Sequence, residues 1–201
     1  MSEKINMIVQ QVVNRIFNSN TYIISTEVSN DVWLVDIGDL DSVSGLLKGE
    51  QVIRGVFITH SHFDHIYGLN NLVERYPDVK IYISADGAKG LFDDKKNFSL
   101  YHEAPLNFVG GDIVVVKDRS IVTLIDDISV ECFYTPGHDT SCMTFRCGNY
   151  LFTGDSYIPN EKPVTNLNGG NKDDYYKSLE IINGLIKQGT ILCPGHGIVN
   201  L

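Results

Sequence analysis

Five of the six histidines of this chain lie at the end of a short apolar segment or in the turn that follows it. The segments before them, "VFIT", "CFYTPG" and "ILCPG", are rich in β-branched and aromatic residues, which favour strands. Histidines that only pack in a core have no reason to collect at one kind of position in three distant segments. Ligands carried on loops at the ends of rigid strands do lie at such positions. The pattern therefore predicts a metal site built from several strand ends.

The segment "THSHFDHIYG" places three of these histidines and one aspartate within six positions. His60 and His62 are two residues apart and can point the same way from an extended segment, whereas Asp64 and His65 follow in the turn into a helix. Two groups of ligands can thus come from one segment. Asp155, in "TGDS", has two carboxylate oxygens that could bridge two metals. Imidazole and carboxylate together suit zinc, iron or manganese better than calcium or magnesium.

Strand-like and helix-like patterns alternate through both halves of the chain. Strands are expected at residues 6–13, 20–26, 32–38, 52–60 and 80–84, and again at 113–118, 121–126, 128–135, 142–148, 149–155 and 190–196. Helices are expected at 41–49, 68–77, 86–96 and 172–189, and residues 97–112 are expected to form a loop across the surface. Two halves that each contain strands followed by helices predict a sandwich of two β-sheets with helices outside.

Charge and composition exclude several kinds of partner. A net charge of -9 and a pI near 5.0 argue against nucleic acid, which attracts clustered Lys and Arg. No segment reaches the ~18 uninterrupted apolar residues of a membrane span, and the N-terminus does not resemble a secretory signal. We therefore expect a cytoplasmic protein that acts on a small molecule, without a membrane partner. The four cysteines form no CxxC pair and are predicted to be reduced thiols.

The motifs "LVDIGD", "THSHFDH", "TPGH", "TGDS" and "PGHG", in this order, resemble those of the metallo-β-lactamase fold superfamily, in its glyoxalase II-like hydrolase branch. The resemblance implies an α/β fold, a four-layer αβ/βα sandwich of two mixed β-sheets with helices on the outer faces, in a single domain of residues 1–201. It also implies roles for individual positions. The first metal would be held by His60, His62 and His138, the second by Asp64, His65 and His196, with Asp155 between them. Asp36 is expected to fix the ligand loops and not to bind metal.

This resemblance implies a metal-dependent hydrolase with two divalent metal ions, zinc first and iron or manganese as alternatives. A hydroxide held between the metals would attack a small ester, thioester or lactone, because coordination lowers the pKa of water from about 15.7 to about 7. Asp64 would orient the hydroxide. Tyr157 would donate a hydrogen bond to the developing oxyanion, although plain packing explains this tyrosine equally well.

Other interpretations remain open at this stage. Persulfide dioxygenases share the motif set but hold one iron through residues that match His60, His138 and Asp155, and a non-catalytic metal-binding module would show a closed metal shell. His102 matches no ligand position and either packs in the loop or contacts substrate. The motif "TPGHDTSC" departs from the more usual "TPGHTPGS", which places Asp139 and Cys142 beside the ligands. Roles for Cys142 and Cys193 and an oligomeric state are not defined by the sequence.

Overall fold

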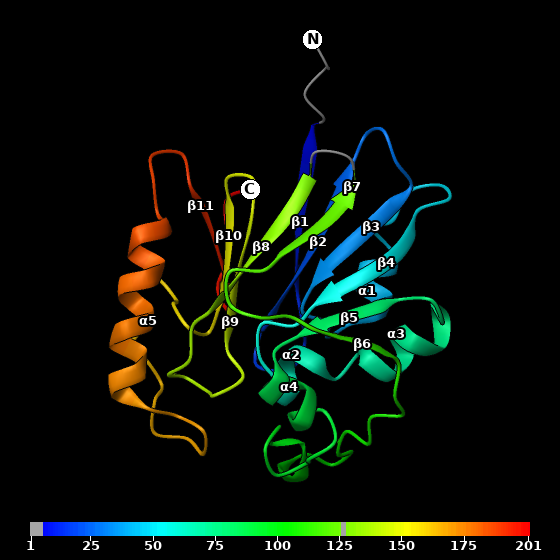
Figure 1. Cartoon of the computed structure of the whole chain (residues 1–201). Coiled ribbons are helices and arrows are strands. Elements are labelled where there is room, and N and C mark those ends of the chain that lie inside the picture. The colour runs from blue at the N-terminus through cyan, green and yellow to red at the C-terminus, as the bar shows by residue number, and fades with distance from the viewer. Residues whose placement is uncertain (1–5, 126–127) are drawn as a thin grey trace.

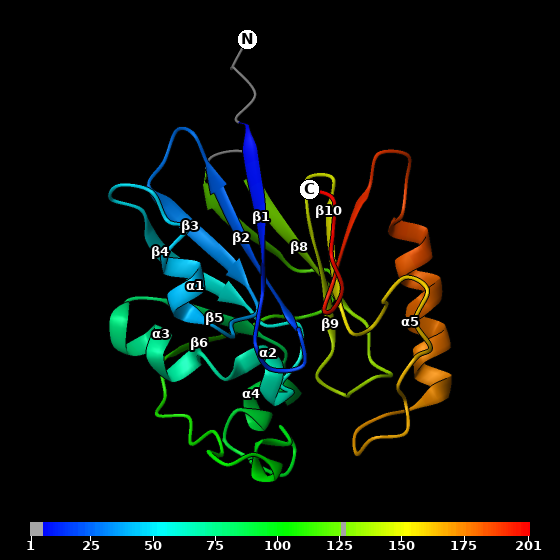
Figure 2. The same ribbon diagram turned by 180° about the vertical axis from the view of Figure 1, so that it is seen from behind.

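The computed structural model describes residues 6–125 and 128–201, whose strands form two β-sheets that pack face to face (Figure 1). Helices α1 to α4 lie on the side of the first sheet, and helix α5 flanks the second sheet (Figures 1 and 2). The sandwich of two mixed sheets with outer helices is the predicted fold class. No helix among the described residues is long and apolar enough to cross a membrane.

The first sheet has the strand order β1-β2-β3-β4-β5-β6. Its strands are β1 (Met7–Val13), β2 (Asn20–Thr26), β3 (Asp31–Val35), β4 (Val52–Phe57), β5 (Lys80–Ile83) and β6 (Asp112–Val115). The pairs β1–β2 and β2–β3 are antiparallel, whereas β3 to β6 run parallel. Parallel neighbours need crossover connections. Those connections carry α1 (Leu40–Ser44), α2 (Phe63–Ile66), α3 (Leu69–Arg75), α4 (Ala85–Gly90) and a 3-10 turn, η1 (Ser99–Tyr101).

The second sheet has the order β11-β10-β9-β8-β7. Its strands are β7 (Ile121–Ile125), β8 (Ile128–Tyr134), β9 (Met143–Cys147), β10 (Tyr150–Gly154) and β11 (Ile191–Pro194). Only β10 and β11 pair in parallel among the strands of this sheet that the structure describes, and α5 (Lys172–Leu185) connects them. Asn171 caps α5 by accepting hydrogen bonds from the backbone N–H groups of Asp173 and Asp174.

Three apolar layers hold the sandwich together, because successive side chains of a strand point to opposite faces. Leu151 faces outward and packs with Ile182 and Leu185 of α5, while Phe152 faces inward to the layer between the sheets. Phe57 lies in the same inner layer and is completely buried. The third layer joins the outer face of the first sheet to its helices. Its members include Val32, Leu34, Val56, Ile66, Leu69 and Leu72.

All four predicted helices are longer than the observed ones. The helix predicted over 41–49 ends at Ser44, and the one predicted over 68–77 is Leu69–Arg75. The predicted helix over 86–96 ends at Gly90, because the Asp93 carboxylate accepts hydrogen bonds from the backbone N–H groups of Lys95 and Lys96 and turns the chain. The predicted helix over 172–189 ends at Leu185, since Ile186 is extended. The loop prediction for 97–112 holds apart from η1 and Asp112, which begins β6. Residue 126 of the predicted strand 121–126 and the first five residues of the N-terminus lie outside the described part.

Candidate metal centre

The ends of four strands bring the predicted ligands to one edge of the sandwich. His60 and His62 follow β4, and α2 then carries Asp64 and His65. From the second sheet, the turns after β8, β10 and β11 carry the remaining three, His138, Asp155 and His196. Their ligand atoms form two separate groups of three, and a further group of His60, His65 and Asp155 overlaps both, so that all seven side chains are included. The structure therefore brings together every residue that the sequence analysis assigned to the two metals.

The segment after β11 is tied to the first sheet. Asn20 Nδ2 and Tyr22 Oη donate hydrogen bonds of 3.0 and 2.7 Å to the carbonyl of Pro194. Ser19 pairs with His196 as an isolated bridge. These bonds place a ligand from the far end of the second sheet against the hairpin that begins the first one.

The first group consists of His60, His62 and His138. Nε2 of His138 lies 2.9 Å from Nδ1 of His62, and the rings of His60 and His138 are 5.0 Å apart between centroids. The ring centroids of the three imidazoles lie 4.6 to 5.0 Å apart, so the three side chains face one another. Three nitrogen ligands are the usual number on a catalytic zinc ion, which keeps a further position for water or substrate.

The second group consists of Asp64, His65 and His196. Oδ2 of Asp64 lies 3.3 Å from Nε2 of His65 and 3.4 Å from Nε2 of His196. Asp155 stands between the groups, with Oδ1 3.5 Å from His65 Nε2 and Oδ2 3.6 Å from His138 Nε2. Gly195 permits this approach, because a Cβ at that position would overlap the Asp155 carboxylate.

Several polar atoms of this cluster are buried without a hydrogen-bond partner among residues 6–125 and 128–201. They are His60 Nε2, His62 Nε2, His65 Nε2 and Asp155 Oδ1. Unpartnered buried polar atoms are costly, so native proteins pair nearly all of them. For His60, His65 and Asp155, the atoms concerned face the interior of the cluster, where a cation would satisfy them. The donor set therefore fits a metal of the zinc, iron or manganese kind.

The second ring nitrogen of four histidines has a partner outside the cluster. His65 Nδ1 lies 2.8 Å from Oδ2 of Asp36, which also accepts a hydrogen bond from the Thr59 hydroxyl. The other three contacts are His60 Nδ1 to Thr59 Oγ1 at 3.0 Å, His138 Nδ1 to the Val164 carbonyl at 2.8 Å, and His196 Nδ1 to the Phe17 carbonyl at 3.1 Å. Such partners orient a ligating imidazole. The expectation that Asp36 fixes the ligand loop is confirmed.

Burial and neighbouring charges set the pKa values of the cluster in a way that favours cation binding. Burial lowers the pKa of His60 and of His138, so both rings stay neutral and can act as ligands. Burial opposes the charge of Asp155, but the nearby His65 and a hydrogen bond from His196 lower its pKa to about 2. The pKa of Asp64 is lowered by the same two neighbours, again against the effect of burial. Both carboxylates are therefore ionised at neutral pH.

We expect metal binding at pH 7.5 to release protons. Burial disfavours charge on His196, but hydrogen bonds to Asp155 and Asp64 raise its pKa to about 10 in the metal-free protein. His196 is thus protonated below that pH and must lose its proton to bind a metal, so affinity should fall as pH falls. Calorimetric titration with zinc in buffers of different ionisation enthalpy measures the number released. A value of zero would contradict this prediction, and His196→Gln should release fewer protons than wild type.

Tyr157 and His102 occupy different surroundings. Tyr157 lines a small pocket together with His138, Asp155 and Val164, so its side chain lies beside the cluster. The His102 ring packs 4.3 Å from Phe63 and 5.7 Å from Phe17 between centroids, and His102 is absent from the metal-binding groups found in the described residues. Packing in the loop is therefore the interpretation that the structure favours for His102.

The cysteines are thiols inside the sandwich. All four are free and buried, as the spacing predicted. Burial raises the pKa of Cys193 to about 12 and that of Cys142 well above its usual value, so both are protonated at neutral pH. Neither belongs to the groups of candidate ligands in the described part of the chain. Cys193 packs in the apolar layer between the sheets.

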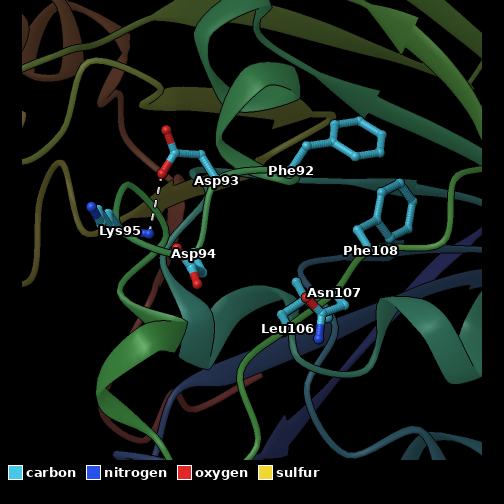
Figure 3. A pocket seen from close by; sticks show the side chains of 7 residues that line it. All are labelled: Phe92, Asp93, Asp94, Lys95, Leu106, Asn107 and Phe108. Carbon is cyan, nitrogen blue, oxygen red and sulfur yellow. Dashed lines mark hydrogen bonds between the residues drawn. The ribbon is translucent and has the colours of Figure 1, made fainter.

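A larger hollow of about 560 Å³ lies away from the cluster, between the end of α4 and residues 106–108. Figure 3 shows the rings of Phe92 and Phe108 on one side and the charged side chains of Asp93, Asp94 and Lys95 on the other. Lys95 donates its backbone N–H to Asp93 Oδ1 at 3.1 Å. The hollow contains none of the seven candidate ligands, so we place the functional site at the strand ends.

Comparisons with known proteins identify the family. The model of the Metallo-beta-lactamase superfamily matches residues 15–196, and the chain belongs to this family. It is 24% identical over 177 residues to the "Probable polyketide biosynthesis zinc-dependent hydrolase PksB" of Bacillus subtilis (strain 168), which covers 87% of this chain and 71% of that protein. It is 25% identical over 173 residues to a hydroxyacylglutathione hydrolase of Buchnera aphidicola subsp. Baizongia pistaciae (strain Bp), which covers 82% of this chain and 57% of the relative.

The fold recurs among solved structures. The crystal structure of the BLEG-1 B3 metallo-beta-lactamase superposes with a TM-score of 0.86 at 23% sequence identity, covering 96% of this chain and 93% of that one. This likeness confirms the predicted architecture. The chain spans little more than half the length of the hydroxyacylglutathione hydrolase that it matches.

Proposed function

We propose that this protein is a metallo-hydrolase that uses two zinc ions to cleave a small ester, thioester or lactone. The observation that carries the proposal is the shared carboxylate. Asp155 faces both groups of candidate ligands, with one oxygen 3.5 Å from His65 Nε2 and the other 3.6 Å from His138 Nε2. An arrangement with two positions and one common acid suits a pair of ions that act on one substrate.

The names of the relatives support the reaction type. Both are called hydrolases, one of them zinc-dependent. The name hydroxyacylglutathione hydrolase describes a substrate whose acyl group is attached to a thiol. The pocket beside His138, Asp155 and Tyr157 adjoins the candidate ligands. The net charge of -9 makes nucleic acid an unsuitable partner, and a cytoplasmic location stays a prediction.

When bound, zinc would lower the pKa of a coordinated water and polarise the substrate carbonyl. The protein's own side chains have separate tasks. Asp64, with Oδ2 3.4 Å from His196 Nε2, would orient the attacking water and accept its proton. Tyr157 would donate its phenolic hydrogen to the carbonyl oxygen as negative charge develops on it. His60 and His65 are completely buried, which keeps their rings in fixed orientations.

The test is turnover of a panel of thioesters, esters and lactones by zinc-loaded protein. We expect zinc-dependent hydrolysis of at least one class. Asp64→Ala should lower kcat about 100-fold or more, because it removes a proposed ligand of the second metal that also orients the attacking water. Tyr157→Phe should lower kcat about 100-fold if its hydroxyl stabilises the oxyanion. Both variants should remain folded by circular dichroism.

Metal analysis of protein purified without chelator distinguishes the alternatives. Two zinc ions per chain agree with the proposal. One iron per chain, with oxygen consumed when a persulfide is added, would contradict the hydrolase proposal. The protein would then be a dioxygenase whose iron is bound by His60, His138 and Asp155. Bound metal without turnover of any substrate in the panel would favour a non-catalytic metal-binding module.

A further inference from the structure

The side chain that follows the ligand His138 is buried beside the cluster. Asp139 is only 7% exposed. Its Oδ1 accepts hydrogen bonds from the backbone N–H of Ser141, at 2.7 Å, and from the Ser141 hydroxyl. Its Oδ2 lies 3.7 Å from Nε2 of His62. One carboxylate oxygen is thus fixed by its own turn, while the other is directed at a candidate ligand.

His62 is the one histidine of the described cluster that lacks a close outer partner. Its Nδ1 faces His138, at 2.9 Å, so Nε2 points away on the opposite side of the ring. That nitrogen is buried and has no hydrogen-bond partner within residues 6–125 and 128–201. The outer nitrogens of the four other rings have partners within 3.1 Å. Asp139 Oδ2 is the acceptor directed at the nitrogen that remains.

The surroundings keep the Asp139 carboxylate in place. Ser141 Oγ accepts a hydrogen bond from the backbone N–H of Ser61 at 3.1 Å, which ties this turn to the loop that carries His62. On the other side lies Gly169, at φ +95°. A Cβ at Gly169 would overlap Asp139 Oδ2, so the absence of a side chain leaves room for the carboxylate. The network joins the two sheets at this point.

We propose that Asp139 is a positioning residue for the first metal. By closing the 3.7 Å separation when a metal binds, its carboxylate would accept the hydrogen of His62 Nε2 and hold His62 in the tautomer whose Nδ1 lone pair faces the position shared with His60 and His138. The inference rests on the proposed metal centre. At the second position, Asp36 already makes the corresponding contact to His65, at 2.8 Å from Nδ1. The two positions are therefore each supported by a buried aspartate, from different sheets.

The chemistry of the pair predicts an effect on metal affinity. A carboxylate hydrogen-bonded to the outer nitrogen of a ligating imidazole fixes its orientation and increases its basicity, and loss of such a partner typically weakens metal binding 10- to 100-fold. Asp139→Asn keeps the size of the side chain but removes the charge. We expect this substitution to weaken the binding of one of the two zinc ions 10- to 100-fold. The affinity for the other ion should stay within about twofold of wild type.

Zinc dissociation constants are measured by competition with a chromophoric chelator, without substrate. Asp78→Asn, at an exposed aspartate, is the matched control and should leave both constants unchanged. If Asp139→Asn binds both ions as tightly as wild type does, the inference is wrong. Wild-type protein that binds no zinc would also overturn it. Failure of the hydrolase proposal is separate, because protein that binds two ions without turnover loses the proposed reaction but not the role of Asp139.

A spectroscopic measurement on wild type does not depend on the folding of any variant. In zinc-loaded protein with 15N-labelled histidine, we expect His62 to carry its proton on Nε2, unlike His60, His65, His138 and His196, which should carry it on Nδ1. The Nε2 signal should shift in Asp139→Asn. A His62 ring that is protonated on Nδ1 would overturn the assignment.

Discussion

Replacement of Asp155 by alanine is expected to lower kcat/KM for the best substrate of the panel by about 1,000-fold or more. Asp155 is the acid shared by both groups, and its Oδ2 lies 3.6 Å from His138 Nε2 and 3.4 Å from His196 Nε2. Its loss removes a proposed ligand from each position and leaves the surrounding histidines without their countercharge. Metal ions in such sites stabilise the transition state by several kcal/mol. Each tenfold loss of rate corresponds to about 1.4 kcal/mol, so the loss of this stabilisation corresponds to about 1,000-fold or more.

Steady-state kinetics and zinc content are measured together for this variant. Asp78→Asn, which changes an exposed aspartate, serves as the control and should retain wild-type kcat/KM. We expect the Asp155 variant to bind less than two zinc ions per chain. A kcat/KM within tenfold of wild type would show that Asp155 is not a shared ligand, and the proposal of a dinuclear site would then fail.

The largest effect on stability is expected from Phe57→Ala. Phe57 is completely buried between the two sheets. Its ring stacks on Tyr82 with centroids 4.5 Å apart and meets the edge of Phe145, from the other sheet, at 5.3 Å. Truncation leaves a cavity that neighbours in both sheets cannot fill, which typically costs about 3–5 kcal/mol. For a domain of this size the expected loss in Tm is about 10 °C.

Chemical and thermal denaturation measure this loss. Phe92→Ala is a matched control, since the Phe92 side chain is 60% exposed, and it should change the free energy of unfolding by about 1 kcal/mol or less. Equal effects of the two substitutions would contradict the placement of Phe57 at the centre of the sandwich. Because Phe57 immediately precedes the segment that carries His60, zinc affinity is also worth measuring in the folded variant.

The sequence predicted the fold and the gathering of the ligands because both depend on side-chain type and order. Strand-like segments that end in histidine or aspartate put His60, His138 and His196 at strand ends, and the structure brings these ends together. The predicted helix ends were less accurate than the predicted strands. Local hydrogen bonds, such as those from Lys95 and Lys96 to Asp93, stop a helix that periodicity alone would continue.

Most of the groups that bond to the outer ring nitrogens of the ligands could not be predicted from the sequence. The carbonyls of Phe17 and Val164 hold His196 and His138, and every residue type offers the same carbonyl. Phe17 also lies in the left-handed region, at φ 52°, which a phenylalanine seldom adopts and no pattern indicates. The motif marks Asp139 as an unusual neighbour of His138, but its direction toward His62 depends on a turn whose path only the structure defines.

The bonds that join Pro194 to Asn20 and Tyr22 have a consequence for the order of assembly. Asn20 and Pro194 are 174 positions apart, so this contact closes a very long loop and is expected to form late in folding. His196 reaches the other ligands only when that loop has closed. A complete metal centre therefore follows the docking of the two sheets during synthesis and refolding, and metal capture by the full set of ligands reports that the chain has finished folding.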